Sequence, residues 1–137
     1  MPYLIEPEVS GQLGDNTIMN ASLHPPKVER LHFVFYGWLG DDLIECFPIF
    51  LITEKLKNGL VVTKLTGYEI KDCQIEESDE FKLLQNVTLP RFFWFLVTGN
   101  EKDDFSISNK KLKVSDNAFS ILNQYNLENA LVSDSVG

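Results

Sequence analysis

The sequence has few of the residues from which catalytic and metal sites are usually built. It contains only two histidines and two cysteines. No H-x-H, H-E-x-x-H, C-x-x-C, G-x-S-x-G or P-loop pattern occurs in it, so the usual signals of zinc hydrolases, thiol oxidoreductases, nucleophile-elbow hydrolases and Walker-type nucleotide binding are missing. We therefore expect no enzymatic activity, no cofactor and no metal.

Long apolar segments are also lacking. The longest unbroken apolar run covers residues 92–97, which is too short for a membrane-spanning helix. The first residues do not follow the basic-then-apolar layout of a signal peptide. We expect a cytoplasmic protein without membrane contact, in which Cys46 and Cys73 are small core side chains rather than redox partners.

Basic residues are too few for a nucleic-acid-binding protein. The chain has 12 Lys and Arg against 20 Asp and Glu, a net charge of −8. Affinity for DNA and RNA comes mostly from neutralising phosphates, so nucleic acids and anionic membranes are not expected partners. Residues 41–104 alone carry a net charge of −6. If their acidic turns lie on one side, they form a negative face for a basic partner.

What the sequence does contain is enough apolar material for one self-sufficient core. Its 137 residues are 44% hydrophobic and include 10 Phe, which indicates a single domain over 1–137. Residues 6–27 are rich in Gly, Pro, Ser and Asn without a sustained period, and they predict a long loop or arm.

Periodicity and turn residues place the regular elements along the remainder of the chain. Strands are predicted at 31–38, 49–52, 92–97, 105–108, 111–114 and 130–132, with 92–97 as the central strand, buried on both faces. A switch of the apolar face at Lys71 and Asp72 predicts a bulge or bend.

Three short helices are predicted from their capping residues. Thr53 caps one over 54–58 that closes near Gly59, and Ser115 caps another that ends near Asn126. A capped helical turn covers 78–84, with Phe81 and Leu84 facing inward.

The two longer capped units align without a gap at an offset of 62 residues. Thr53 then matches Ser115, Leu60 matches Leu122 and Ile70 matches Val132. The pattern is strand, capped helix and strand, twice over. The expected fold is α+β: a mainly antiparallel or mixed sheet with a few short helices packed on it and two strand-helix-strand pseudo-repeats.

Acidic residues occur in pairs, and two of the paired clusters are our candidates for a partner-binding surface. Neighbouring carboxylates on a strand point to opposite faces and do not converge alone on a substrate, and no calcium-loop pattern surrounds them. They are typical of solvated turns. The candidates are Asp41 and Asp42 in one cluster, and Glu76, Glu77, Asp79 and Glu80 in the other.

An aromatic residue joins these candidates. Trp38 borders a Gly-Asp turn and is expected to be more exposed than Trp94, which lies inside the apolar run. An exposed aromatic side chain among polar turns is a common binding anchor.

Six segments of the chain carry a resemblance to a known group of proteins. They are Gly-Trp-Leu-Gly-Asp-Asp-Leu at 37–43 and the segments at 50–56, 65–70, 89–99, 103–105 and 112–116. Together they resemble bacterial immunity proteins of polymorphic toxin systems, including contact-dependent growth inhibition, over residues 30–132. The resemblance implies a cytoplasmic protein that binds one toxin domain and covers or distorts its active site. It carries over no binding residues, because the contacts differ from one toxin pair to the next.

Two other interpretations stay open at this point. One is a small hydrolase that uses a carboxylate with His24 or His32. The other is a ligand-binding or oligomeric scaffold without a toxin. The acidic composition favours the immunity interpretation, because a toxin nuclease must itself be basic to hold nucleic acid.

Overall fold

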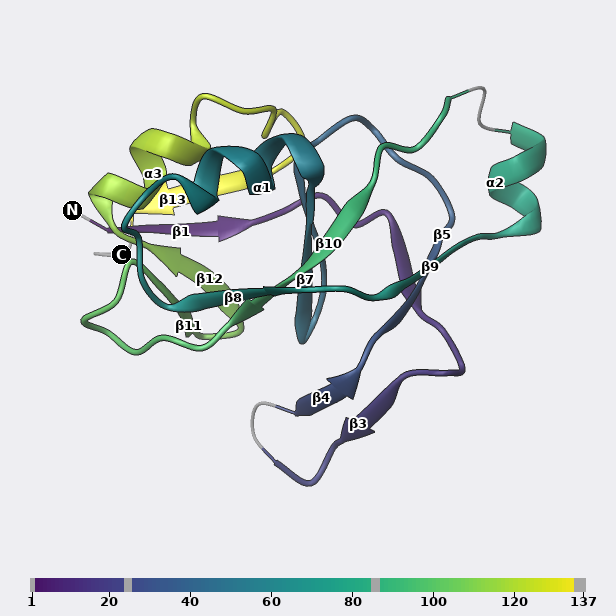
Figure 1. Cartoon of the computed structure of the whole chain (residues 1–137), viewed down its shortest axis with the longest axis horizontal. Coiled ribbons are helices and arrows are strands. Elements are labelled where there is room, and N and C mark those ends of the chain that lie inside the picture. The colour runs from purple at the N-terminus through teal and green to yellow at the C-terminus, as the bar shows by residue number, and fades with distance from the viewer. Residues whose placement is uncertain (1, 24–25, 85–86, 135–137) are drawn as a thin grey trace.

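The computed structural model describes residues 2–23, 26–84 and 87–134 and has the predicted α+β fold (Figure 1). The helices are α1 (Glu54–Val61), α2 (Asp79–Leu84) and α3 (Asp116–Leu122). The strands of the N-terminal half are β1 (Tyr3–Glu6), β2 (Gly11–Leu13), β3 (Ile18–Asn20), β4 (Lys27–Arg30), β5 (His32–Phe35), β6 (Leu43–Cys46) and β7 (Ile49–Thr53). Those of the C-terminal half are β8 (Tyr68–Lys71), β9 (Gln74–Glu77), β10 (Phe92–Val97), β11 (Phe105–Ser108), β12 (Lys111–Val114) and β13 (Leu131–Asp134).

Two four-stranded sheets share one topology. Their strand orders are β6-β7-β10-β8 and β11-β12-β1-β13, with antiparallel pairing throughout. In each sheet a hairpin is followed by a helix, and the next strand returns to the opposite edge. Residues that match at the offset of 62 occupy equivalent places in the two sheets. Ile70 of the edge strand pairs with Phe95 of its neighbour, and the matching Val132 pairs with Ile5 of its neighbour. The predicted pseudo-repeat is therefore present in the fold.

The two helix caps are built in the same way. The Thr53 hydroxyl accepts the Leu56 amide, and the Ser115 hydroxyl accepts the Ala118 amide. Each cap donates to an aspartate eleven residues earlier, Thr53 to Asp42 at 2.7 Å and Ser115 to Asp104 at 2.6 Å. Both predicted caps are confirmed.

Each of these aspartates also binds the loop that follows the helix of the other repeat. The second oxygen of Asp42 accepts the Asn126 amide at 2.9 Å, and the second oxygen of Asp104 accepts the Thr66 amide at 2.9 Å. The repeats are thus joined by reciprocal hydrogen bonds.

Strand β10 separates two hydrophobic cores. The helix-side core contains Phe93 and Phe95 together with Ile5, Phe50, Leu60, Phe105 and Leu122. The β5-side core contains Phe92 and Trp94 together with Val28, Phe33, Phe35, Ile44 and Phe81. Alternate β10 side chains enter opposite cores, which explains why its apolar run is unbroken. The prediction of a central strand buried on both faces is confirmed.

Residues 6–27 differ from the predicted loop or arm. Strand β2 pairs with β5, and β3 pairs with β4 in a hairpin that extends from the body of the molecule (Figure 1). The second half of the segment is thus an arm with strand structure. Its strands have only three or four residues and no strong apolar alternation, so the sequence does not reveal them.

Three local predictions also need correction. The predicted bulge or bend at Lys71 and Asp72 is instead a break between two strands, since β8 ends at Lys71 and pairs with β10 while β9 joins β5 in another sheet. Helix α1 continues past Gly59, whose missing side chain makes room for the Tyr125 hydroxyl. Leu84 points outward and is 82% exposed, because the short α2 helix contacts the core through Phe81 alone.

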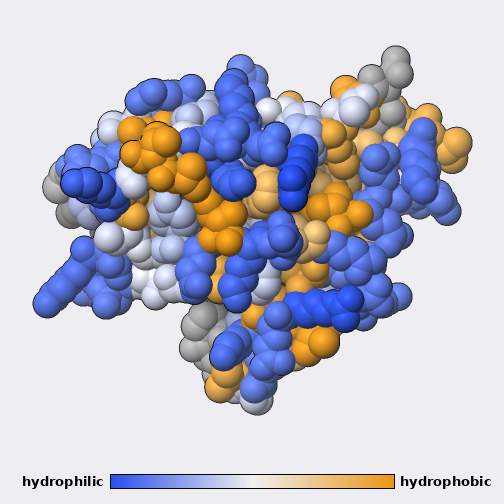
Figure 2. Space-filling view, viewed as in Figure 1, coloured by the Kyte–Doolittle hydropathy of each residue, from blue (hydrophilic) through white to orange (hydrophobic). Residues whose placement is uncertain are grey.

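The face shown in Figure 2 is mainly hydrophilic, and apolar residues reach the surface at the C-terminal end of α1, on the β3–β4 hairpin and beside α2. The exposed apolar side chains there include Ile18, Met19, Leu83 and Leu84. Among the described residues, no helix combines the length and apolar character needed to cross a bilayer.

Candidate functional site

The candidate site begins where β5 and β9 lie side by side. These strands are parallel, with His32 opposite Gln74 and Phe35 opposite Glu77. The chain then turns into α2, whose first turn is capped by the Ser78 hydroxyl at 3.0 Å from the Phe81 amide. This arrangement brings the four acidic residues of the predicted cluster at 76–80 to one edge of the molecule.

The His32 side chain lies on the inner side of this acidic edge and contacts two neighbouring segments. Its Nε2 lies 2.9 Å from a Glu76 carboxylate oxygen, and its Nδ1 accepts the Asn16 amide at 3.2 Å. Nδ1 therefore carries no proton in this arrangement, and Nε2 donates to Glu76. Gly14 packs on the imidazole, where an added Cβ would stand only 2.2 Å from Nδ1.

A concave surface of about 500 Å³ opens beside His32. We call it the acidic hollow, because the described residues that line it include five carboxylate side chains and one lysine: Asp15, Glu76, Glu77, Asp79, Glu80 and Lys82. No three of the described His, Cys, Asp and Glu side chains are placed to share a metal ion. The hollow is suited to cationic side chains. Its carboxylates attract them by charge, and such contacts do not require the fixed coordination geometry of a metal ion.

An apolar surface adjoins the acidic hollow. Gln12 and Tyr36 line both the hollow and a second depression, which Val9, Trp38 and Leu39 also line. Val9 is 70% exposed, Leu39 is 68% exposed and Tyr36 is 45% exposed. We call these three residues the apolar rim. A cluster of exposed apolar side chains beside a charged region is typical of an interaction surface.

Trp38 lines the same depression as the apolar rim. It is half-buried, its Nε1 donates to the Asp41 carbonyl at 2.9 Å, and its ring meets Phe92 edge-on. Trp94 is only 3% exposed, so the predicted order of exposure is confirmed. The structure brings Trp38 and the 76–80 cluster to the same side of the molecule through Tyr36.

Asp41 and Asp42 do not belong to this surface, and the prediction that they form an exposed acidic turn is wrong. Asp41 is 0% exposed and Asp42 is 6% exposed. Asp41 accepts hydrogen bonds from the backbone amide and side-chain amide of Asn129, both at 2.9 Å. The carboxylates face inward because the loop at 126–129 supplies donors that a buried charge requires.

Glu8 is a functional neighbour that the sequence did not indicate. Its carboxylate is buried and accepts the Leu39 amide at 2.7 Å, the Asp41 amide at 3.2 Å and the Ser10 hydroxyl. It therefore fixes the loop that presents Leu39. The sequence shows Glu8 only as a carboxylate between a proline and a glycine, in a segment without hydrophobic periodicity, and this does not indicate burial.

A carboxyl group near Glu8 makes stability depend on pH. Burial, assisted by the charge of Glu6, raises the pKa of Glu45 from 4.5 to about 7. The folded state therefore binds a proton more tightly than the unfolded state, so this contribution to stability falls as pH rises from about 4.5 to about 7.

We expect Glu45→Gln to raise the melting temperature at pH 8 and to leave it nearly unchanged at pH 4. Subtracting the wild-type value at each pH isolates this residue from the other carboxyl groups. A difference between variant and wild type that does not change with pH would contradict the assignment.

The cysteines contribute no reactive thiol to the site. Both are free, and both pack against the β5-side core, as predicted for small core side chains. Burial, with the nearby Asp72 charge, raises the pKa of Cys73 to about 11, and burial also raises the pKa of Cys46. Both thiols are therefore protonated at neutral pH, in the less nucleophilic form.

Of the two histidines considered for a hydrolase, His24 lies outside the described residues. The His32 ring contacts a carboxylate and a backbone amide, and both of its nitrogens are occupied. A general base needs a nitrogen within reach of the proton that it removes. The described contacts of His32 instead hold the strands and the Gly14 loop together.

Comparison with protein-family models, curated proteins and solved structures finds no match.

Proposed function

We propose that this protein is an immunity protein that binds a basic toxin domain, such as a nuclease, and covers its active site or substrate surface. The observation that carries the proposal is the continuity of the acidic hollow with the apolar rim. Carboxylates attract the partner and orient it, while exposed apolar and aromatic side chains supply the contacts that slow dissociation. The resemblance to immunity proteins agrees with this division of roles.

The acidic hollow also matches what a nuclease presents. A domain that holds nucleic acid displays Lys and Arg along its substrate groove. Five carboxylates on one concave surface are a counterpart to such a groove, and occupying the groove excludes the substrate. No residue of the inhibitor needs to perform chemistry, which is consistent with a His32 whose two nitrogens are already engaged.

The test uses the toxin domain encoded by the adjacent gene, in active form for growth and in inactivated form for binding. We expect co-expression to restore growth and the purified proteins to form a stoichiometric complex. Neither result is expected if the protein is an enzyme or scaffold. Turnover of ester, phosphoester or glycoside substrates that is lost on His32→Ala would favour the hydrolase interpretation instead.

Leu39 offers a separate test of the apolar rim. Because it is 68% exposed, Leu39→Ser is expected to change the free energy of unfolding by no more than about 0.5 kcal/mol. It should weaken toxin binding by about tenfold, mainly through faster dissociation.

Val62→Ser is the matched control for Leu39→Ser, since Val62 is another highly exposed aliphatic residue, at the end of α1. Surface plasmon resonance on both variants gives the comparison. Equal effects of the two substitutions would argue against a contact at the rim.

A further inference from the structure

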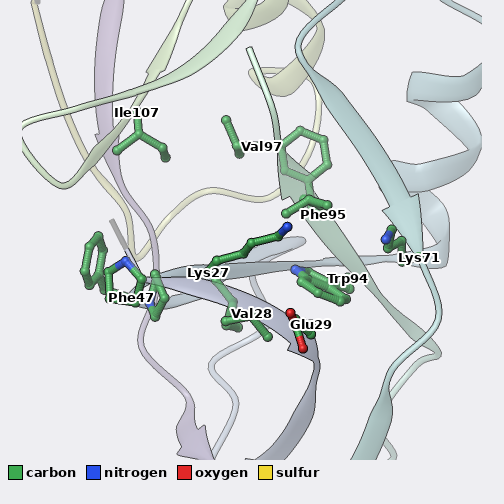
Figure 3. Close-up of a pocket in the computed structure, with 13 residues that line it drawn as sticks. Lys27, Val28, Glu29, Phe47, Lys71, Trp94, Phe95, Val97 and Ile107 are labelled. Atoms are coloured by element: carbon green, nitrogen blue, oxygen red, sulfur yellow. The ribbon is translucent and has the colours of Figure 1, made fainter. Parts of the chain in front are cut away.

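A further pocket, separate from the acidic hollow and from the depression at the apolar rim, lies between the arm strand β4 and strand β10 (Figure 3). Its volume is about 490 Å³, within the usual range of about 300–1,000 Å³ for small-molecule sites. Its walls are mostly apolar and include Val28, Phe47, Ile49, Phe95, Val97 and Ile107. The pocket shares no residue with the acidic hollow or the apolar rim.

Trp94 gives this pocket an unsatisfied hydrogen-bond donor. The side chain is 97% buried, and none of the described groups accepts a hydrogen bond from its Nε1. In Figure 3 the indole nitrogen lies on the side of the ring that faces Lys27 and the pocket interior. Buried indole N–H groups usually have a partner, and an orphaned one costs free energy that a bound acceptor would recover.

The charge around Trp94 indicates what kind of acceptor fits. Lys27 and Lys71 line the pocket, and the Lys71 Nζ lies 5.6 Å from the centre of the Trp94 ring. Among the described residues of the lining, Glu29 is the single carboxylate, and it makes no hydrogen bond to the indole. The lining therefore has an excess of positive charge in a protein whose net charge is −8. An indole N–H in a lining that also contains two lysines is suited to an anionic oxygen.

We propose that this pocket binds a small monocarboxylate with an apolar body, with the carboxylate accepting from Trp94 Nε1 between Lys27 and Lys71. The apolar body lies against Phe95, Val97 and Ile107. Glu29 at the margin disfavours ligands with more than one negative charge. The site is a ligand-binding function additional to the proposed toxin binding, and it does not depend on that proposal.

The indole N–H resonance of Trp94 provides a direct measurement. The protein has two Trp residues, and the Trp38 indole already donates to the Asp41 carbonyl, so Trp38→Phe assigns the two signals. On titration with octanoate we expect the Trp94 N–H signal to move downfield and saturate, with the Trp38 signal unchanged. Octanamide, which has the same chain without the charge, should bind about tenfold more weakly.

Substitutions test the three groups separately. Lys27→Met and Lys71→Met keep the aliphatic stems and should each weaken octanoate binding severalfold, while Glu29→Gln should strengthen it. Lys57→Met is the control, because Lys57 also lies over an aromatic ring, Phe93 at 4.3 Å, but does not line the pocket. Trp94→Phe should weaken octanoate binding by about tenfold and affect octanamide less.

Two results would overturn the proposal. One is a Trp94 N–H signal that does not move up to millimolar octanoate in the wild-type protein, a measurement that holds even if Trp94→Phe does not fold. The other is equal binding of octanoate and octanamide, unchanged by the lysine variants, which would indicate apolar filling without carboxylate recognition.

Discussion

Asp42→Ala is expected to lower the free energy of unfolding by about 3–5 kcal/mol, because it removes two hydrogen bonds to a buried carboxylate and leaves their donors unsatisfied. Asp42 is 6% exposed. One oxygen accepts from the Thr53 hydroxyl, which caps α1, and the other accepts from the Asn126 amide in the second repeat. The substitution therefore weakens a helix cap and a contact between repeats together.

The repeat supplies a built-in comparison for Asp42. Asp104 makes the equivalent bonds to Ser115 and Thr66 but is more exposed, so Asp104→Ala should cost less, about 1–3 kcal/mol. Asp72→Ala is the control, since its side chain is 88% exposed and lies 3.7 Å from Arg91. Its expected effect is within about 0.5 kcal/mol.

Urea unfolding of the three variants measures these differences. A cost for Asp42→Ala no larger than that for Asp72→Ala would mean that the carboxylate does not hold the repeats together. Double-mutant cycles of Asp42 with Thr53 and of Asp104 with Ser115 should both give favourable coupling, as expected for two copies of one arrangement.

Features that depend on neighbours along the chain are predictable from this sequence. The caps at Thr53, Ser78 and Ser115 act on amides three residues away. The predicted strands at 105–108 and 111–114 pair with each other across Asn109 and Lys110, two residues with positive φ. The apolar run of β10 predicted its place between two cores for the same reason. The pseudo-repeat was found because it rests on these local patterns.

Environments that are set by distant parts of the chain are not predictable from the sequence alone. Asp41 and Asp42 have the composition of a solvated turn, but Asn126 and Asn129, whose amides donate to them, are more than 80 residues away. Glu8 looked like part of a loop, although it binds Leu39 across 31 positions. The outward position of Leu84 depends on how little of α2 meets the core. These long-range contacts decide which acidic residues are structural and which remain free to bind.

Carboxylates of the acidic hollow that make no described structural contact are the ones to change in a test of toxin binding. Changing Glu77, Asp79 and Glu80 together to lysine is expected to slow association with the basic toxin domain by about 10–100-fold at low salt. Glu76 is left in place because it pairs with His32. Dissociation should change little, since the contacts that slow it belong to the apolar rim.

The matched control changes Glu54, Glu101 and Glu128 to lysine. These three residues are exposed, as are Asp79 and Glu80, while Glu77 is half-buried. Glu54 occupies the first turn of α1 as Asp79 and Glu80 occupy that of α2. Both triple variants therefore shift the net charge equally. The control removes one acidic residue from a helix N-terminus, and the hollow variant removes two. Thermal melting of each checks that the fold is retained.

Salt separates local attraction from the overall charge. At physiological ionic strength the Debye length is about 8 Å, so only carboxylates close to the interface influence the association rate. The wild-type rate should fall as salt increases, and the hollow variant should show a much weaker dependence, while the control variant follows the wild type. Equal slowing of both variants would assign the effect to net charge. A rate that ignores both salt and the hollow substitutions would place binding elsewhere on the protein and would remove the acidic hollow from the mechanism.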